Sequence, residues 1–87
     1  MKRYDPNWEQ ATLQKLGEEL TKLRNSTGFS QTFVACELDT QKPSISRLEN
    51  GRTNATWLTV AHYARLMGYE IVFRKADDSP NEKGHAG

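Results

Sequence analysis

The sequence predicts an all-α domain in which four main helices are followed by one β-strand. Two observations indicate this fold class. Along four successive stretches, apolar residues recur at steps of three and four, and each stretch ends near a glycine or an aspartate. From Tyr69 to Lys75 the apolar spacing changes to two, which is typical of a strand. The helical body spans residues 8–68, a polar lead-in occupies residues 1–7, and residues 76–87 lack large hydrophobes and should form a disordered tail.

Length and charge exclude several classes of protein. The chain has 87 residues, enough for one small domain, and its 12 Lys and Arg residues against 11 Asp and Glu residues give a net charge of +1. Because a basic coat over the whole surface is excluded, any phosphate-binding surface must be a local patch. One cysteine cannot form an internal disulfide, and no apolar run is long enough for a membrane span or a signal peptide. We therefore expect a cytoplasmic protein with no membrane partner.

The first two helices follow from the spacing of their apolar residues. The leucines of the first helix share one face: Leu13, Leu16, Leu20 and Leu23. Gly28 can adopt the left-handed conformation that ends a helix. Ser30 is suited to cap a second helix, because its hydroxyl can accept a hydrogen bond from a free amide of the first turn. Val34, Ala35 and Leu38 of that helix should face inward.

Two further helices are delimited in the same way. Asp39 ends the second helix, and Thr40 caps a third one that spans about residues 41–50. Thr56 caps a fourth helix, which ends at Gly68. The inward-facing apolar residues of these two helices are Ile45, Leu48, Trp57, Val60, Ala64 and Met67.

The predicted strand at residues 69–75 has no convincing partner elsewhere in the chain. A lone strand leaves its backbone donors and acceptors unpaired, so we expect it to pair with the same strand of a second copy in a homodimer. The alternative is a short extended segment that lies on the fourth helix of its own chain. The residues assigned to the dimer strand are Tyr69, Ile71, Val72 and Phe73.

The second and third helices carry the functional prediction. Two short helices joined by about three residues must cross steeply, and Ala35 is small enough to allow that close crossing. A helix placed in this way fits the major groove of DNA, which is about 12 Å wide, and Arg or Lys on it can donate to guanine O6 and N7. Burial of the apolar residues leaves one outward face, whose members are Gln41, Lys42, Pro43, Ser46 and Arg47.

Several separated motifs occur in the order of one known family. Leu16-Gly17, Leu23-Arg24, GFSQ at residues 28–31 and SISRLENGR at residues 44–52 resemble the Cro/repressor-type (Xre-type) helix-turn-helix family, with residues 31–50 as its helix-turn-helix. The segment after Gly68 is similar to that of HigA/HipB-like antitoxins and related small repressors. The resemblance implies a lambda-repressor-like fold and a transcriptional repressor that binds a palindromic operator in double-stranded DNA as a homodimer.

The resemblance also implies roles for single residues. The outward face of the third helix would contact bases, although Gln41 and Lys42 could serve the helix start and Ser46 could face solvent. Arg24 and Glu49 would form a structural ion pair between the first and third helices. Asn50 could instead only end the third helix, and Ser44 could hydrogen-bond locally. The residues expected to contact DNA phosphates are Ser30, Gln31, Thr40, Ser44, Asn50 and Arg52.

Two positions depart from the family pattern, and one alternative function stays open. Asp39 stands where the family usually has glycine, and aspartate tolerates the left-handed conformation better than most residues. Phe33 stands at a usually polar position and could contact the DNA backbone or a protein partner. The alternative function is that of an antitoxin in a type II toxin–antitoxin pair, which neutralises a protein toxin and autoregulates its operon.

No arrangement of residues predicts an enzyme, a metal site or a cofactor. The sequence has no HExxH motif, no glycine-rich phosphate loop and no nucleophile with a base at a suitable spacing. Cys36, His62 and His85 have no partner at the spacing of metal ligands. The expected partner is therefore DNA, with a protein toxin as the alternative.

Overall fold

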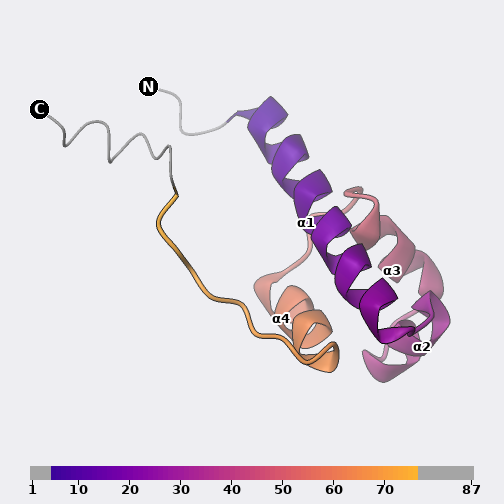
Figure 1. Cartoon of the computed structure of the whole chain (residues 1–87). Coiled ribbons are helices and arrows are strands. Elements are labelled where there is room, and N and C mark those ends of the chain that lie inside the picture. The colour runs from indigo at the N-terminus through magenta and orange to yellow at the C-terminus, as the bar shows by residue number, and fades with distance from the viewer. Residues whose placement is uncertain (1–4, 77–87) are drawn as a thin grey trace, which may run out of the picture.

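The computed structural model describes residues 5–76, which form four α-helices (Figure 1). The helices are α1 (Pro6–Thr27), α2 (Gln31–Glu37), α3 (Lys42–Glu49) and α4 (Trp57–Leu66). The predicted all-α architecture is thus confirmed, and residues 5–76 contain no β-strand. Residues 1–4 of the predicted lead-in, His85 and all but one residue of the predicted tail lie outside the described residues.

α1 begins two residues earlier than predicted because Asp5 is its N-cap. The Asp5 carboxylate accepts hydrogen bonds from the backbone amides of Asn7, at 2.9 Å, and Trp8, at 3.3 Å. Pro6 fits the first turn because its missing amide hydrogen is not needed there. The helix ends at Gly28, whose φ of 81° is left-handed, as predicted.

The caps of the next helices agree with the sequence at two positions and differ at one. Ser30 Oγ accepts from the Phe33 amide at 3.0 Å, and Thr56 Oγ1 accepts from the Thr59 amide at 3.2 Å, as predicted. Thr40 is not the cap of α3, so that prediction was wrong. The Thr40 amide donates to Ala35 O at 2.8 Å and so belongs to the turn that ends α2. The extended residue that precedes α3 is Gln41.

Asp39 lies between the two short helices in the left-handed conformation, with a φ of 55°. It is the one non-glycine residue with positive φ among the described residues. The turn therefore has the backbone that glycine would favour, and aspartate is one of the residues that adopt it at modest cost.

One core joins all four helices. Its buried members are Leu20, Val34, Ala35, Ile45, Leu48, Tyr63 and Met67. Trp57, which the spacing places inward, is 55% exposed because it is the first residue of α4, at the edge of this core.

α1 approaches the C-terminal end of α3 closely enough for backbone to meet backbone. A Cβ atom built on Gly17 would lie 2.3 Å from Glu49 O, so only glycine allows this approach. A Cβ on Gly51, which has a φ of 69°, would lie 2.8 Å from Gln14 Cα. Gln10 adds a hydrogen bond from Nε2 to Gly51 O at 3.2 Å. These contacts fix the position of α3 against α1.

The chain after α4 continues without regular secondary structure and passes alongside α4, as the orange segment of Figure 1 shows. Ile71 is half-buried there, and the ring of Phe73 stacks on that of Trp57 with 5.6 Å between centroids. The segment thus lies on its own fourth helix, as in the alternative given above. Its pairing with a second copy stays a prediction, because a strand requires a neighbour that one chain does not supply.

Candidate nucleic-acid interface

α3 separates its buried and exposed side chains cleanly. Ile45, Leu48 and Glu49 are buried against the other helices. We call the opposite side of this segment the reading face, and its members are Gln41, Lys42, Pro43, Ser46 and Arg47. All of them are exposed except Ser46, which is half-buried. The amphipathic pattern of α3 therefore leaves mostly hydrogen-bonding side chains at the surface.

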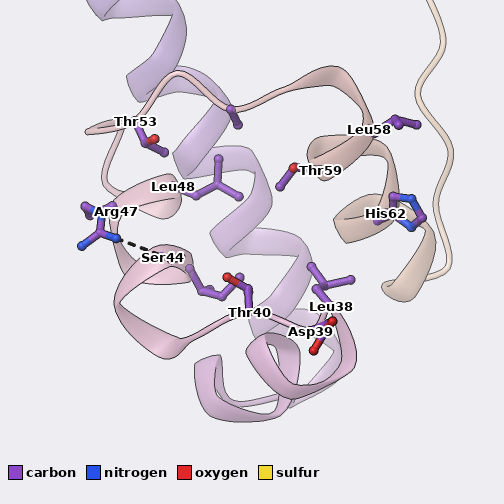
Figure 2. Close-up of a pocket in the computed structure, with 12 residues that line it drawn as sticks. Leu38, Asp39, Thr40, Ser44, Arg47, Leu48, Thr53, Leu58, Thr59 and His62 are labelled. Carbon is purple, nitrogen blue, oxygen red and sulfur yellow. Dashed lines mark hydrogen bonds between the residues drawn. The ribbon is translucent and has the colours of Figure 1, made fainter.

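Arg47 is the strongest hydrogen-bond donor of the reading face. In the described part of the chain its guanidinium makes one hydrogen bond, from Nη2 to Ser44 Oγ at 3.5 Å (Figure 2). This long contact leaves most of the guanidinium donors available, and their planar arrangement matches a surface with two adjacent acceptors. Lys42, in the first turn of α3, adds a second exposed cation to the same face.

Several side chains at the ends of α2 and α3 already make hydrogen bonds within the fold. Ser30 Oγ caps α2, and Gln31 Nε2 donates to Glu49 Oε1 at 2.9 Å. Asn50 Nδ2 donates to Ser46 O at 2.8 Å and so helps to end α3. Thr40 and Arg52 are exposed on either side of α3. Contact with a phosphate by Ser30 or Asn50 must therefore use the remaining hydrogen-bonding capacity of each side chain.

Behind the reading face, one buried carboxylate connects the four helices. Glu49 is 7% exposed and accepts from Arg24 twice, from Nε at 2.7 Å and from Nη2 at 3.0 Å. It also accepts from Gln31 of α2 and from the hydroxyl of Tyr63 of α4. We call these four residues the Glu49 cluster. Because each comes from a different helix, the cluster fixes the orientation of α3 relative to the rest of the fold.

The protonation states of the Glu49 cluster follow from its geometry. Burial alone would raise the pKa of Glu49, but hydrogen bonds from Arg24, Tyr63 and Gln31 hold it below its usual value. Burial and the adjacent carboxylate raise the pKa of Tyr63, so its hydroxyl stays neutral. The hydrogen bond to Glu49 raises the pKa of Arg24. The cluster is thus an ionised acceptor surrounded by protonated donors.

A groove of about 490 Å³ lies between α3 and α4, next to the reading face. Figure 2 shows Ser44 and Arg47 on the α3 side of this groove and Leu58 and His62 on the α4 side. The part of the chain that the structure describes has no group of three His, Cys, Asp or Glu residues that could hold a metal ion. No helix among residues 5–76 is long and apolar enough to cross a membrane.

Sequence reasoning missed two members of the Glu49 cluster. Gln31 was expected only at a phosphate, whereas the structure places its amide on Glu49. Tyr63 was not among the site residues predicted from the sequence, although a fully buried tyrosine hydroxyl needs a polar partner. The signal that could have identified Tyr63 is this need for a polar partner, combined with the predicted Arg24–Glu49 ion pair.

Comparison with known proteins agrees with the observed arrangement of helices. The family described as "Helix-turn-helix domain" matches residues 15–70, which include α2, α3, α4 and the Glu49 cluster. Among solved structures, the chain is similar to the restriction-modification controller protein C.AhdI from Aeromonas hydrophila, with 26% sequence identity and a TM-score of 0.66. The similarity covers 70% of this chain and 88% of that chain. No curated protein sequence matches the chain.

Proposed function

The chain belongs to the helix-turn-helix domain family, and on this basis we propose that it represses transcription as a homodimer that reads a palindromic operator. The observation that carries the proposal is the division of α3 into a buried apolar side and an exposed reading face. The likeness to a controller protein supports a regulatory role.

In this proposal α3 enters the major groove and the reading face contacts base edges. Arg47 donates two hydrogen bonds to guanine O6 and N7, which suits its planar guanidinium. Lys42 and Gln41 reach neighbouring bases from the start of α3, where side chains of a recognition helix usually contact bases. Pro43 and Ser46 line the same face and limit which bases fit beside it. Discrimination between sequences thus comes from α3.

Phosphate contacts at both ends of the helix pair set the register of α3 on the duplex. Such contacts give affinity without sequence information, and they weaken as the salt concentration rises. Gln31 contributes its second amide hydrogen, since its first is held by Glu49. The full set proposed for the phosphates is Ser30, Gln31, Thr40, Ser44, Asn50 and Arg52.

The operator should be symmetric because two copies bind together. A dimer presents its two reading helices to successive major-groove faces, about 34 Å apart along the duplex. Two-fold symmetry of the protein then requires two inverted half-sites. The dimer contact is assigned to residues 69–75.

We expect Arg47→Ala to lower the affinity for the selected operator by about 1–3 kcal/mol and to relax base choice at one position of each half-site. The reason is loss of a bidentate contact to one base, while the phosphate contacts remain. Selection from random duplexes followed by titration in fluorescence anisotropy measures both effects.

Lys22→Ala is the control for the loss of one positive charge. Lys22 is exposed on α1, where it makes a 3.5 Å ion pair with Glu19. This variant should select the same sequence as the wild type and bind it with nearly the same affinity. Base preferences of Arg47→Ala that are identical to those of the wild type would contradict the assignment of Arg47.

A further inference from the structure

The C-terminal segment presents apolar side chains that the single chain leaves uncovered. Phe73 is 87% exposed and Val72 is 72% exposed, and the ring of Phe73 stacks on that of the exposed Trp57. The Tyr69 amide donates to Ala64 O at 2.9 Å, and after it the backbone of residues 70–74 makes no hydrogen bond to the described part of the chain. An apolar surface beside a free backbone edge is suited to addition of another strand.

One face of this segment is already held by its own domain. Ile71 lines a groove of about 420 Å³ together with Leu16, Leu20 and Val60, and Phe73 stacks on Trp57. Ile71 therefore faces α1 and α4, whereas Phe73, two residues further on, contacts Trp57 but stays 87% exposed. The edge of the segment, rather than this face, is what a partner must bind.

Two of the three charged residues of the segment, Glu70 and Arg74, lie at equal distances on either side of Val72. Glu70 lies two residues before Val72 and Arg74 lies two residues after it. In an antiparallel pair of identical segments centred on Val72, Glu70 lies opposite the partner's Arg74, and two-fold symmetry forms this pair twice. The same register places Ile71 opposite the partner's Phe73. Opposite charges and apolar pairs at facing positions both stabilise a sheet.

A shift of one residue in the register removes both the Glu70–Arg74 charge pairs and the Ile71–Phe73 apolar pairs. Pairing in which Val72 faces the partner's Phe73 would place the Ile71–Phe73 face of the two copies on opposite sides of the ribbon. Glu70 would then face the partner's Lys75, and Arg74 would face the partner's Ile71. The register centred on Val72 keeps both apolar faces on one side, against the two helical domains.

We propose that residues 69–75 form a two-stranded antiparallel ribbon with the same residues of a second copy, in the register that pairs Glu70 with the partner's Arg74. This inference rests on the proposed homodimer and specifies its contact surface. The self-complementary charges favour a second copy over an unrelated protein, because an isologous contact requires a surface that matches itself. Residues 77–87 carry no large apolar side chain that could cover this surface instead.

Charge reversal in the full-length chain tests the register. Glu70→Arg and Arg74→Glu should each weaken the dimer at least about tenfold, because each change places like charges opposite one another twice. The double variant should regain the wild-type dimer, since both pairs are restored with reversed polarity. Sedimentation velocity over a range of concentrations gives the dimer dissociation constants. Far-UV circular dichroism checks that each variant keeps its helices.

Two further variants serve as controls. Glu18→Arg makes the same charge change on the exposed side of α1 and should leave the dimer unchanged. Glu70→Arg combined with Lys75→Glu, which only the shifted register would tolerate, should remain as weak as Glu70→Arg or weaker. Recovery in this combination but not in the Glu70/Arg74 double variant would overturn the proposed register.

The inference can fail separately from the proposed function. A wild-type chain that stays monomeric at all concentrations, or charge reversals that leave the dimer unchanged, would overturn the ribbon. Association of the segment with a different protein in place of a second copy would overturn it as well. Binding of a single half-site by the chain, sensitive to Arg47→Ala, would still support the reading of DNA by α3.

Discussion

Replacing Glu49 by alanine is expected to lower the free energy of unfolding by about 3–5 kcal/mol, enough to unfold a domain of this size at moderate temperature. The change leaves the mostly buried guanidinium of Arg24 without its counter-charge and the hydroxyl of Tyr63 without its acceptor carboxylate. Unfolding in urea, followed by circular dichroism, measures the loss.

Glu19→Ala provides the matched control. Glu19 also forms an ion pair, with Lys22, but both side chains are more than half exposed. Exposed pairs of this kind contribute little, so the control should change the free energy of unfolding by less than about 1 kcal/mol. Equal effects of the two substitutions would show that the Glu49 cluster does not hold the helices together.

The pH dependence of the free energy of unfolding provides a second test of the stabilising role of Glu49. Its pKa in the folded chain lies below the usual value of a glutamate, which is about 4.3. The stabilisation it provides is therefore complete above that usual value and is lost as the pH falls through the lowered pKa of the folded state. The difference in stability between the wild type and Glu49→Gln should shrink in acid. A difference that grows in acid would contradict the lowered pKa.

The second large effect is expected at Gly17. In most exposed helical positions, replacing glycine by alanine gains about 1 kcal/mol of stability. Here the new methyl group would overlap Glu49 O and lie 2.8 Å from Leu48 O. Since the crowded atoms belong to backbone rather than to a flexible side chain, α1 and α3 must separate. We expect Gly17→Ala to cost about 3 kcal/mol or more, at the upper end for crowding in a core.

Gly28→Ala separates crowding from backbone strain. Gly28 has a left-handed φ, but a Cβ at this position would meet no atom within 4 Å. Its substitution should therefore cost only about 1–2 kcal/mol, the cost of a left-handed non-glycine residue. Thermal and urea unfolding of both variants would test the difference. A Gly17→Ala variant as stable as the wild type would exclude the close approach of α1 to α3.

The parts of the fold that sequence reasoning predicted depend on local chemistry. Ser30 and Thr56 cap helices through a hydroxyl that reaches the third residue along the chain, and Gly28 ends a helix by its own φ. Such contacts involve near neighbours in sequence and can be recognised there. Thr40 was wrongly predicted as a cap because its amide is taken up by the end of α2, a choice that depends on the geometry of the turn.

The candidate site was predictable in outline for a different reason. Burial of Ile45 and Leu48 at helical spacing determines which residues of α3 face outward. The contacts of Tyr63 with Glu49 and of Gln31 with Glu49 join residues far apart in sequence, and only the packed fold shows which polar groups meet. The alternating pattern after α4 predicted a strand, but residues 69–76 have no regular secondary structure in the single chain. Pairing of this segment depends on a second chain and stays a prediction.

The central claim is that the reading face of α3 meets DNA, and mapping the contact on the protein tests it most directly. The backbone amides of the labelled chain are followed by NMR while a selected operator duplex is added at low salt. The account predicts shifts at Gln31 and across Gln41–Arg47, with amides around Lys22 on α1 unchanged. Absence of any shift with selected and random duplexes, or shifts confined to another face, would contradict it.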